Sequence, residues 1–151
     1  MEFRKFEITL ISATDLENVR VLGKMKVHTR ASLSGGTAAN GVEKRSPVDK
    51  HGETNPTWNY TMRFAVSEAM VENFNTMLVV KLYCKRKLQD RYVGEIHTPL
   101  KKLFNFARGG SPVINVPVQK GCVNSQGMLT FSYKFGEKML LAESVAGVSL
   151  A

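Results

Sequence analysis

Cysteine is scarce in this chain of 151 residues, which contains only Cys84 and Cys122. The two form no CxxC pair and no Cys/His cluster at metal-ligand spacing, which argues against a structural zinc site and favours a reduced, intracellular protein. Long apolar runs are also missing, since no stretch approaches the roughly 18 residues of a transmembrane helix. The first residues lack the apolar segment of a signal peptide, so we expect a cytoplasmic protein.

The motifs that carry common enzyme chemistry are missing too. No serine stands in a G-x-S-x-G elbow, and no glycine-rich phosphate loop precedes a helix. The three histidines, His28, His51 and His97, are scattered along the chain, which argues against a metal site or a catalytic triad. We therefore predict that the protein is not an enzyme and needs no cofactor.

Acidic residues are outnumbered by basic ones, 13 against 21, which gives a net charge of +8. Such a charge attracts polyanions: nucleic acid, an anionic membrane surface or an acidic protein. Nucleic acid is disfavoured because the chain has no recognised binding motif and its aromatic residues do not interleave with its cations. An excess of lysine that simply aids solubility is the other interpretation, so the position of the charges must decide.

Apolar and polar residues alternate in several short segments, which is the period of a half-buried β-strand. The alternation is clearest at 6–10 and at 58–66, and residues typical of turns separate the segments. Residues 99–106 have apolar side chains at helical spacing after Pro99, which predicts one short helix, and 67–75 could form a helical turn or a loop. About eight strands in one domain favour an all-β sandwich.

Basic residues gather on one face of the predicted strand 25–33. The apolar face consists of Met25, Val27, Thr29, Ala31 and Leu33. The basic face consists of Lys24, Lys26, His28 and Arg30. Lys44 and Arg45 lie on what should be the adjoining strand. We predict that this face binds anionic head groups. The alternative is a solvated face on which cations prevent aggregation.

Two segments carry a resemblance to a known family. Residues 55–64, which read NPTWNYTMRF, resemble the NP-x-W-N-x-x-x-x-F signature of C2 domains, and 90–95, which read DRYVGE, resemble their D-D-x-(I/V)-G segment. Residues 15–19 and 23–27 resemble the first loop and second strand of small plant C2 proteins of the cold-regulated and elicitor-responsive kind. The resemblance covers roughly residues 3 to 135. It implies an eight-stranded antiparallel Greek-key sandwich whose end loops face membranes and hold calcium between aspartates.

The sequence departs from this pattern where the family holds its calcium. The family's aspartates would fall near Arg20 and at Lys26, Cys84, Arg86 and Asp90, so that only Asp90 keeps a carboxylate. Calcium needs about 6–8 oxygen ligands, and the neighbouring cations would repel it. We predict that the calcium site is lost and that Asp90 is a weak candidate ligand. Asp15 and Asp49 are interpreted as residues that shape turns.

The same substitutions suggest that fixed cations contact lipid phosphates in place of the metal, each contributing about 1 kcal/mol near an anionic leaflet. We predict a peripheral membrane module, and the resemblance implies a role in plant stress or defence signalling. The predicted lipid-binding residues are Arg20, Lys24, Lys26, His28, Arg30, Lys44, Arg45, Lys85, Arg86, Lys87 and Arg91. The alternatives are an adaptor that docks acidic proteins and a calcium-dependent lipid binder with a degenerate site.

The last residues differ from the rest of the chain. Residues 136–151 contain apolar side chains without a clear period. We predict a C2 domain at 1–135 followed by a disordered or loosely helical tail at 136–151. The apolar residues of this tail would suit a protein partner or a second copy of the chain, and the oligomeric state stays open.

Overall fold

The structure is a computed structural model that describes residues 2–20, 22–35, 42–140 and 149–150. Its elements in chain order are β1 (Glu2–Thr14), β2 (Val27–Ser34), β3 (Lys44–Arg45), β4 (Thr57–Ser67), α1 (Glu68–Glu72), β5 (Met77–Cys84), β6 (Arg91–Pro99), α2 (Leu100–Ala107), β7 (Val113–Lys120), β8 (Val123–Phe135), β9 (Met139–Leu140) and β10 (Ser149–Leu150). The predicted helix is α2, and α1 is a second helix in the segment that the sequence left open between a helical turn and a loop.

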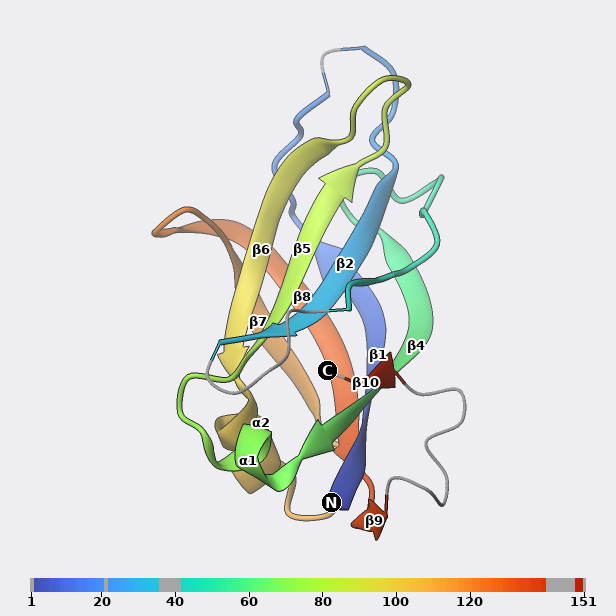
Figure 1. Cartoon of the computed structure of the whole chain (residues 1–151). Helices are drawn as coiled ribbons and strands as arrows, with labels where there is room; N and C mark the ends of the chain where they lie inside the picture. The colour runs from blue at the N-terminus through green and yellow to red at the C-terminus, as the bar shows by residue number, and fades with distance from the viewer. Residues whose placement is uncertain (1, 21, 36–41, 141–148, 151) are drawn as a thin grey trace.

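The strands form one curled sheet that folds into two layers (Figure 1). One layer has the order β4-β1-β8-β7 and the other the order β6-β5-β2-β3. The layers join where β6 meets β7, which share the single register pair Glu95 and Gln119. The pairings among β1 to β8 are antiparallel. The predicted all-β, eight-stranded antiparallel sandwich is therefore confirmed.

The core lies between the layers and follows from the alternation seen in the sequence. Phe6, Ile8 and Leu10 of β1 are fully buried, and Phe131 of β8 is fully buried beside them. The rings of Phe6 and Phe135 stack with their centroids 4.7 Å apart. Each large apolar side chain buried in this way stabilises the fold by about 1.5–3 kcal/mol. The two layers are thereby held as a rigid support for their loops.

Three loops meet at one end of the sandwich, and α1 and α2 lie at the other end (Figure 1). The β1–β2, β3–β4 and β5–β6 loops are called the tip loops below. Backbone hydrogen bonds join them: Leu16 N donates to Thr54 O at 3.0 Å, and Lys85 N donates to Lys26 O at 2.8 Å. These bonds fix the positions of the tip loops relative to one another.

The NP-x-W segment at 55–58 joins three parts of this end. The Asn55 side chain accepts a hydrogen bond from Asp15 N at 3.0 Å, and Asp15 has the left-handed φ of 52° that its tight turn requires. Pro56 O accepts from Ala13 N at 3.0 Å. Trp58 Nε1 donates to Val27 O at 3.0 Å, which links β4 in one layer to β2 in the other. Trp58 thus packs against the core and ties the two layers together.

The carboxyl-terminal residues add two short strands to the sheet. Met139 and Leu140 of β9 pair with Phe3 and Glu2 of β1. Ser149 and Leu150 of β10 pair in parallel with β4. These four residues therefore join the sheet instead of lying outside it, which differs from the disordered or loosely helical tail that we expected. Residues 141–148 and 151 lie outside the described residues, and the boundary at residue 135 stays a prediction.

Candidate functional site

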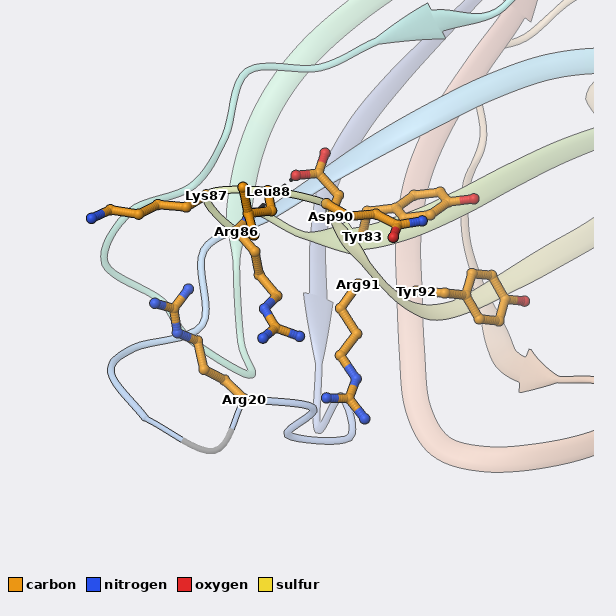
Figure 2. A pocket seen from close by; sticks show the side chains of 9 residues that line it. Arg20, Tyr83, Arg86, Lys87, Leu88, Asp90, Arg91 and Tyr92 are labelled. Atoms are coloured by element: carbon orange, nitrogen blue, oxygen red, sulfur yellow. Dashed lines mark hydrogen bonds between the residues drawn. The ribbon is translucent and has the colours of Figure 1, made fainter.

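An open depression of about 760 Å³ lies between the tip loops. Its lining residues come from the β1–β2 loop and from the β5–β6 loop with its flanking strands: Arg20, Tyr83, Arg86, Lys87, Leu88, Gln89, Asp90, Arg91 and Tyr92. Figure 2 shows these side chains from close by. Five of the predicted site residues, including the candidate ligand Asp90, thus meet in one place, and we call this depression the tip pocket.

The carboxylate of Asp90 is engaged by donors from its own chain. Its Oδ2 accepts a hydrogen bond from Arg30 Nη2 at 2.8 Å and lies 3.7 Å from His28 Nε2. Its Oδ1 accepts from the backbone N–H of Arg86 at 3.3 Å. Burial alone would raise the pKa of Asp90, but these hydrogen bonds and the charge of Lys85 outweigh it and hold that pKa below its usual value. Asp90 is therefore a permanent counter-charge for Arg30.

The other acids of the tip loops do not converge on Asp90. Asp49 closes its own loop, since its carboxylate accepts hydrogen bonds from the backbone N–H groups of His51, Gly52 and Thr57. Asp15 forms its turn through its backbone, as described above. Among the described residues, no three His, Cys, Asp or Glu side chains are placed to hold a metal ion. One engaged carboxylate does not fit the oxygen cage that calcium requires.

Arg20 bridges two of the tip loops. Its Nη1 donates to Lys85 O at 3.0 Å in the β5–β6 loop, and its Nε donates to Leu22 O in its own loop. The first of these two hydrogen bonds links the β1–β2 loop to the β5–β6 loop. The guanidinium group of Arg20 is therefore held in a defined orientation.

The remaining cations of the β5–β6 loop point into solvent. Arg86, Lys87 and Arg91 are exposed, and so is Lys85. In Figure 2 the side chains of Arg86 and Arg91 extend to one side of the loop, whereas Lys87 points away from both. This end of the molecule therefore presents a dense positive surface.

Two apolar residues complete the tip and were not singled out in the sequence. Leu22 in the β1–β2 loop is 81% exposed, and Leu88 in the β5–β6 loop is fully exposed. The sequence contains a signal that could have identified Leu88, since this apolar residue directly follows the basic run of Lys85, Arg86 and Lys87. Exposed leucines next to cations are suited to a surface that has both charge and hydrocarbon.

The second predicted set, on the outer face of β2 and β3, comes together only in part. His28 and Arg30 share this face, but His28 is only 4% exposed. Its ring stacks on Tyr83 at a centroid distance of 6.1 Å, and Arg30 lies 3.7 Å above the Tyr83 ring. Burial and then the charge of Arg30 lower the pKa of His28. The expectation that His28 lies exposed with the cations is wrong, because it packs beneath Arg30.

The side chains of Lys44 and Arg45 lie on opposite faces of the sheet, although the two residues are neighbours in sequence. Arg45 pairs with Arg30 across β3 and β2, so it lies on the outer face, where it forms an exposed ion pair of 3.1 Å with Glu43. Lys44 instead pairs with the buried Ala31, donates to Arg63 O and lies 5.3 Å from the centroid of the Phe64 ring. Burial and then the charge of Arg63 lower the pKa of Lys44. Lys44 therefore does not join the outer basic face.

Lys24 and Lys26 precede β2 and are exposed in the β1–β2 loop, so they belong with the tip loops and not with the strand predicted for them. The outer face beyond β2 is not uniformly basic. Glu95 on β6 accepts a hydrogen bond from the hydroxyl of Tyr92 and contacts His97. Burial would raise the pKa of Glu95, but these partners outweigh it and lower that pKa. The outer face therefore has mixed charge.

None of the helices in the described part of the chain is long and apolar enough to span a bilayer.

The comparisons with known proteins agree with the fold. Protein SRC2 of Glycine max is 37% identical over 139 residues, which cover 91% of this chain and 48% of that protein. A Protein SRC2 homolog of Arabidopsis thaliana is 31% identical over 146 residues, which cover 95% of this chain and 44% of that protein. The chain thus spans about half the length of these curated relatives.

Solved structures have the same architecture. A C2 domain of a plant extended synaptotagmin 1 superposes with a TM-score of 0.69 at 17% identity and covers 87% of this chain and 93% of its own. A C2 domain-containing protein from a putative elicitor-responsive gene superposes with a TM-score of 0.64 at 26% identity and covers 93% of each chain. The family model for the C2 domain matches residues 4–113. The fold, the tip loops and these matches agree, and the chain belongs to the C2 domain family.

Proposed function

We propose that this protein is a peripheral membrane-binding module that recognises anionic phospholipids through its tip loops without calcium. C2 domains are modules that bind membranes, lipids or proteins, which indicates a non-catalytic binding role. The observation that carries the calcium-independent mechanism is the engagement of Asp90 by Arg30 and the Arg86 backbone, together with the cations that line the rest of the tip pocket.

Electrostatics supports attraction to an anionic leaflet. Arg20, Arg86, Lys87 and Arg91 line the tip pocket beside a single acid that is already paired. Each such cation near an anionic surface contributes about 1 kcal/mol, screened by salt. A surface with three or four of them holds a protein at the membrane in a strongly salt-dependent way.

The exposed leucines support a membrane in preference to another polyanion. Leu22 and Leu88 lie on the two loops that carry these cations. Burying a leucine side chain in hydrocarbon contributes about 1.5–3 kcal/mol, which neither nucleic acid nor soluble phosphate can supply. Cations at the depth of the head groups with leucines below them suit an interfacial orientation.

The charges can be tested by co-sedimentation with vesicles that contain phosphatidylserine. Changing Arg86 and Arg91 together to Ala is expected to weaken the free energy of vesicle binding by about 2 kcal/mol, which lowers the partition coefficient about thirtyfold. The matched control changes Lys102 and Lys134, two exposed cations away from the tip, to Ala and is expected to have a much smaller effect. Equal losses in both variants would mean that only net charge matters and would reject the tip as the docking site.

A protein-docking role is the second candidate, and the opposite end of the sandwich favours it. Phe74 after α1 is 76% exposed, and Phe106 in α2 is 65% exposed. Lys101 lies 4.3 Å from the centroid of the Phe74 ring, and Lys102 is exposed beside it. Exposed aromatic and basic groups of this kind suit an acidic partner. Changing Phe74 and Phe106 to Ser is expected to abolish such binding and to spare vesicle binding.

The similarity to a protein from a putative elicitor-responsive gene and to plant SRC2 proteins supports a place in plant stress or defence signalling. The membrane-binding function proposed here would place the protein at the cytoplasmic face of a membrane.

A further inference from the structure

One side of the tip pocket has positive charge only. In Figure 2 the guanidinium groups of Arg20, Arg86 and Arg91 lie on one side of the β5–β6 loop, while the carboxylate of Asp90 points to the other side. Asp90 is the single acid among the lining residues, and it is paired with Arg30. Three permanent cations therefore line a space whose one acid is already paired with Arg30.

Arg20 is held in place before any ligand arrives. Two of its three guanidinium nitrogens donate to the carbonyl groups of Leu22 and Lys85, and among the described residues Nη2 has no acceptor of its own. Gly23 provides the space, because a Cβ atom there would lie 3.2 Å from Arg20 Nε. An orientation set in advance lowers the entropy cost of binding an anion.

Arg86 and Arg91 supply free donors. Within the described part of the chain, neither guanidinium group has a hydrogen bond or ion pair, and Arg86 is tied only through its backbone N–H. Each guanidinium presents five N–H donors in a planar fork that matches two oxygens of a phosphate. Lysine cannot reproduce this geometry, because its ammonium group acts as a point charge.

The number and charge of these donors match one class of head group. A phosphomonoester has about −1.5 to −2 charge at neutral pH and three terminal oxygens, whereas a phosphodiester has one charge and two terminal oxygens. Three arginines around one space therefore satisfy the monoester more completely. The ammonium group of phosphatidylserine would also be repelled by them.

We propose that the tip pocket binds the phosphomonoester group of a membrane lipid in preference to phosphodiester lipids of the same surface charge. This inference rests on the membrane-binding function proposed above and specifies its ligand. A lipid is favoured over a soluble phosphomonoester because the exposed Leu88 lines the pocket and Leu22 is exposed on the neighbouring loop.

The test uses the full chain and two kinds of vesicles matched in electrophoretic mobility, one with phosphatidic acid and one with phosphatidylserine. The expected result is about tenfold tighter binding to phosphatidic acid, which corresponds to one additional charge-assisted hydrogen-bond pair. Changing Arg86 and Arg91 together to Lys keeps the charge and removes the forks. This variant should lose the preference and keep its binding to phosphatidylserine.

Lys87→Ala is the control, because Lys87 points away from Arg86 and Arg91 (Figure 2) and its ammonium group offers no planar fork. It should weaken binding to both vesicles equally and retain the preference. Equal binding of the unchanged protein to both matched vesicles would overturn the phosphomonoester site and leave the membrane function standing. Binding to neither vesicle would reject the membrane function itself.

Soluble glycerol 3-phosphate distinguishes the source of the phosphomonoester. It should fail to displace the protein from phosphatidic acid vesicles at a concentration equal to that of the accessible lipid. Displacement at that concentration would identify a soluble phosphate ester as the ligand and overturn the lipid assignment.

The stability of the variant in which Arg86 and Arg91 are changed to Lys is checked by thermal unfolding. An unfolding temperature equal to that of the unchanged protein would confirm that any loss of preference is local to the pocket.

Discussion

Arg30 Nη2 lies 2.8 Å from Asp90 Oδ2, so that a side chain of β2 contacts the last residue of the β5–β6 loop. The contact neutralises a cation of the sheet with the one acid that lines the tip pocket. Both side chains are largely shielded, with exposed fractions of 16% and 14%. The pair therefore differs from exposed surface ion pairs, which contribute little.

The first prediction concerns this pair. Asp90→Asn is expected to lower the free energy of unfolding by about 2 kcal/mol, because a shielded, charge-assisted hydrogen bond is lost and Arg30 is left without its counter-charge. Urea unfolding measures the change. The control Glu43→Gln removes the exposed ion pair with Arg45 and should cost less than about 0.5 kcal/mol. Similar costs in the two variants would contradict the role given to Asp90.

The second prediction concerns pH. The pKa of His28 is lower in the folded protein than in the unfolded chain, because burial and Arg30 disfavour its charged form. The unfolded chain therefore binds more protons than the folded protein below about pH 6.5, so that stability falls as the pH decreases through that value. His28→Gln cannot titrate and should flatten this fall. A wild-type stability that is constant between neutral pH and the folded pKa of His28 would contradict the assignment.

The third prediction separates the two neighbours on β3. Arg45→Ala is expected to weaken binding to anionic vesicles by a few fold, since its side chain lies on the outer face beside Arg30. Lys44→Ala should leave vesicle binding nearly unchanged and should lower stability, because Lys44 donates to Arg63 O and packs against Phe64. Co-sedimentation and urea unfolding of both variants measure these effects. A larger loss of vesicle binding for Lys44→Ala than for Arg45→Ala would show that Lys44 belongs to the outer basic face.

The fourth prediction concerns insertion of the tip. Leu88→Ala is expected to weaken vesicle binding about tenfold, because part of a leucine's contribution of about 1.5–3 kcal/mol is removed, and to leave stability unchanged. Phe106→Ala at the opposite end is the control and should have no effect on vesicle binding. If Leu88→Ala binds as well as the wild type, the tip does not enter the hydrocarbon region.

Much of the fold could be predicted because it depends on local pattern. The alternation of Phe6, Ile8 and Leu10 indicates which face of β1 is buried, and the NP-x-W segment and Gly94 locate the loops around them. Gly94 has a physical reason: a Cβ atom there would lie 2.6 Å from Val118 Cγ1, where β6 approaches β7. The four residues of β9 and β10 were missed because two-residue strands have no period to detect.

The candidate site could be predicted only in part. The cations of the β5–β6 loop are contiguous in sequence and were found, but the pairing of Arg30 with Asp90 spans 60 residues and has no local signal. The burial of His28 and the inward position of Lys44 depend on how two layers and an edge strand pack. Alternation gives the face of a residue on a strand, but it does not say what covers that face.

The most direct test of calcium-independent docking is co-sedimentation of the full chain with phosphatidylserine vesicles in calcium and in a chelator of calcium. Equal binding under the two conditions, with a steep decrease as salt is raised, is the predicted result. Binding that requires calcium would contradict the claim that the paired Asp90 and the surrounding arginines have replaced the metal.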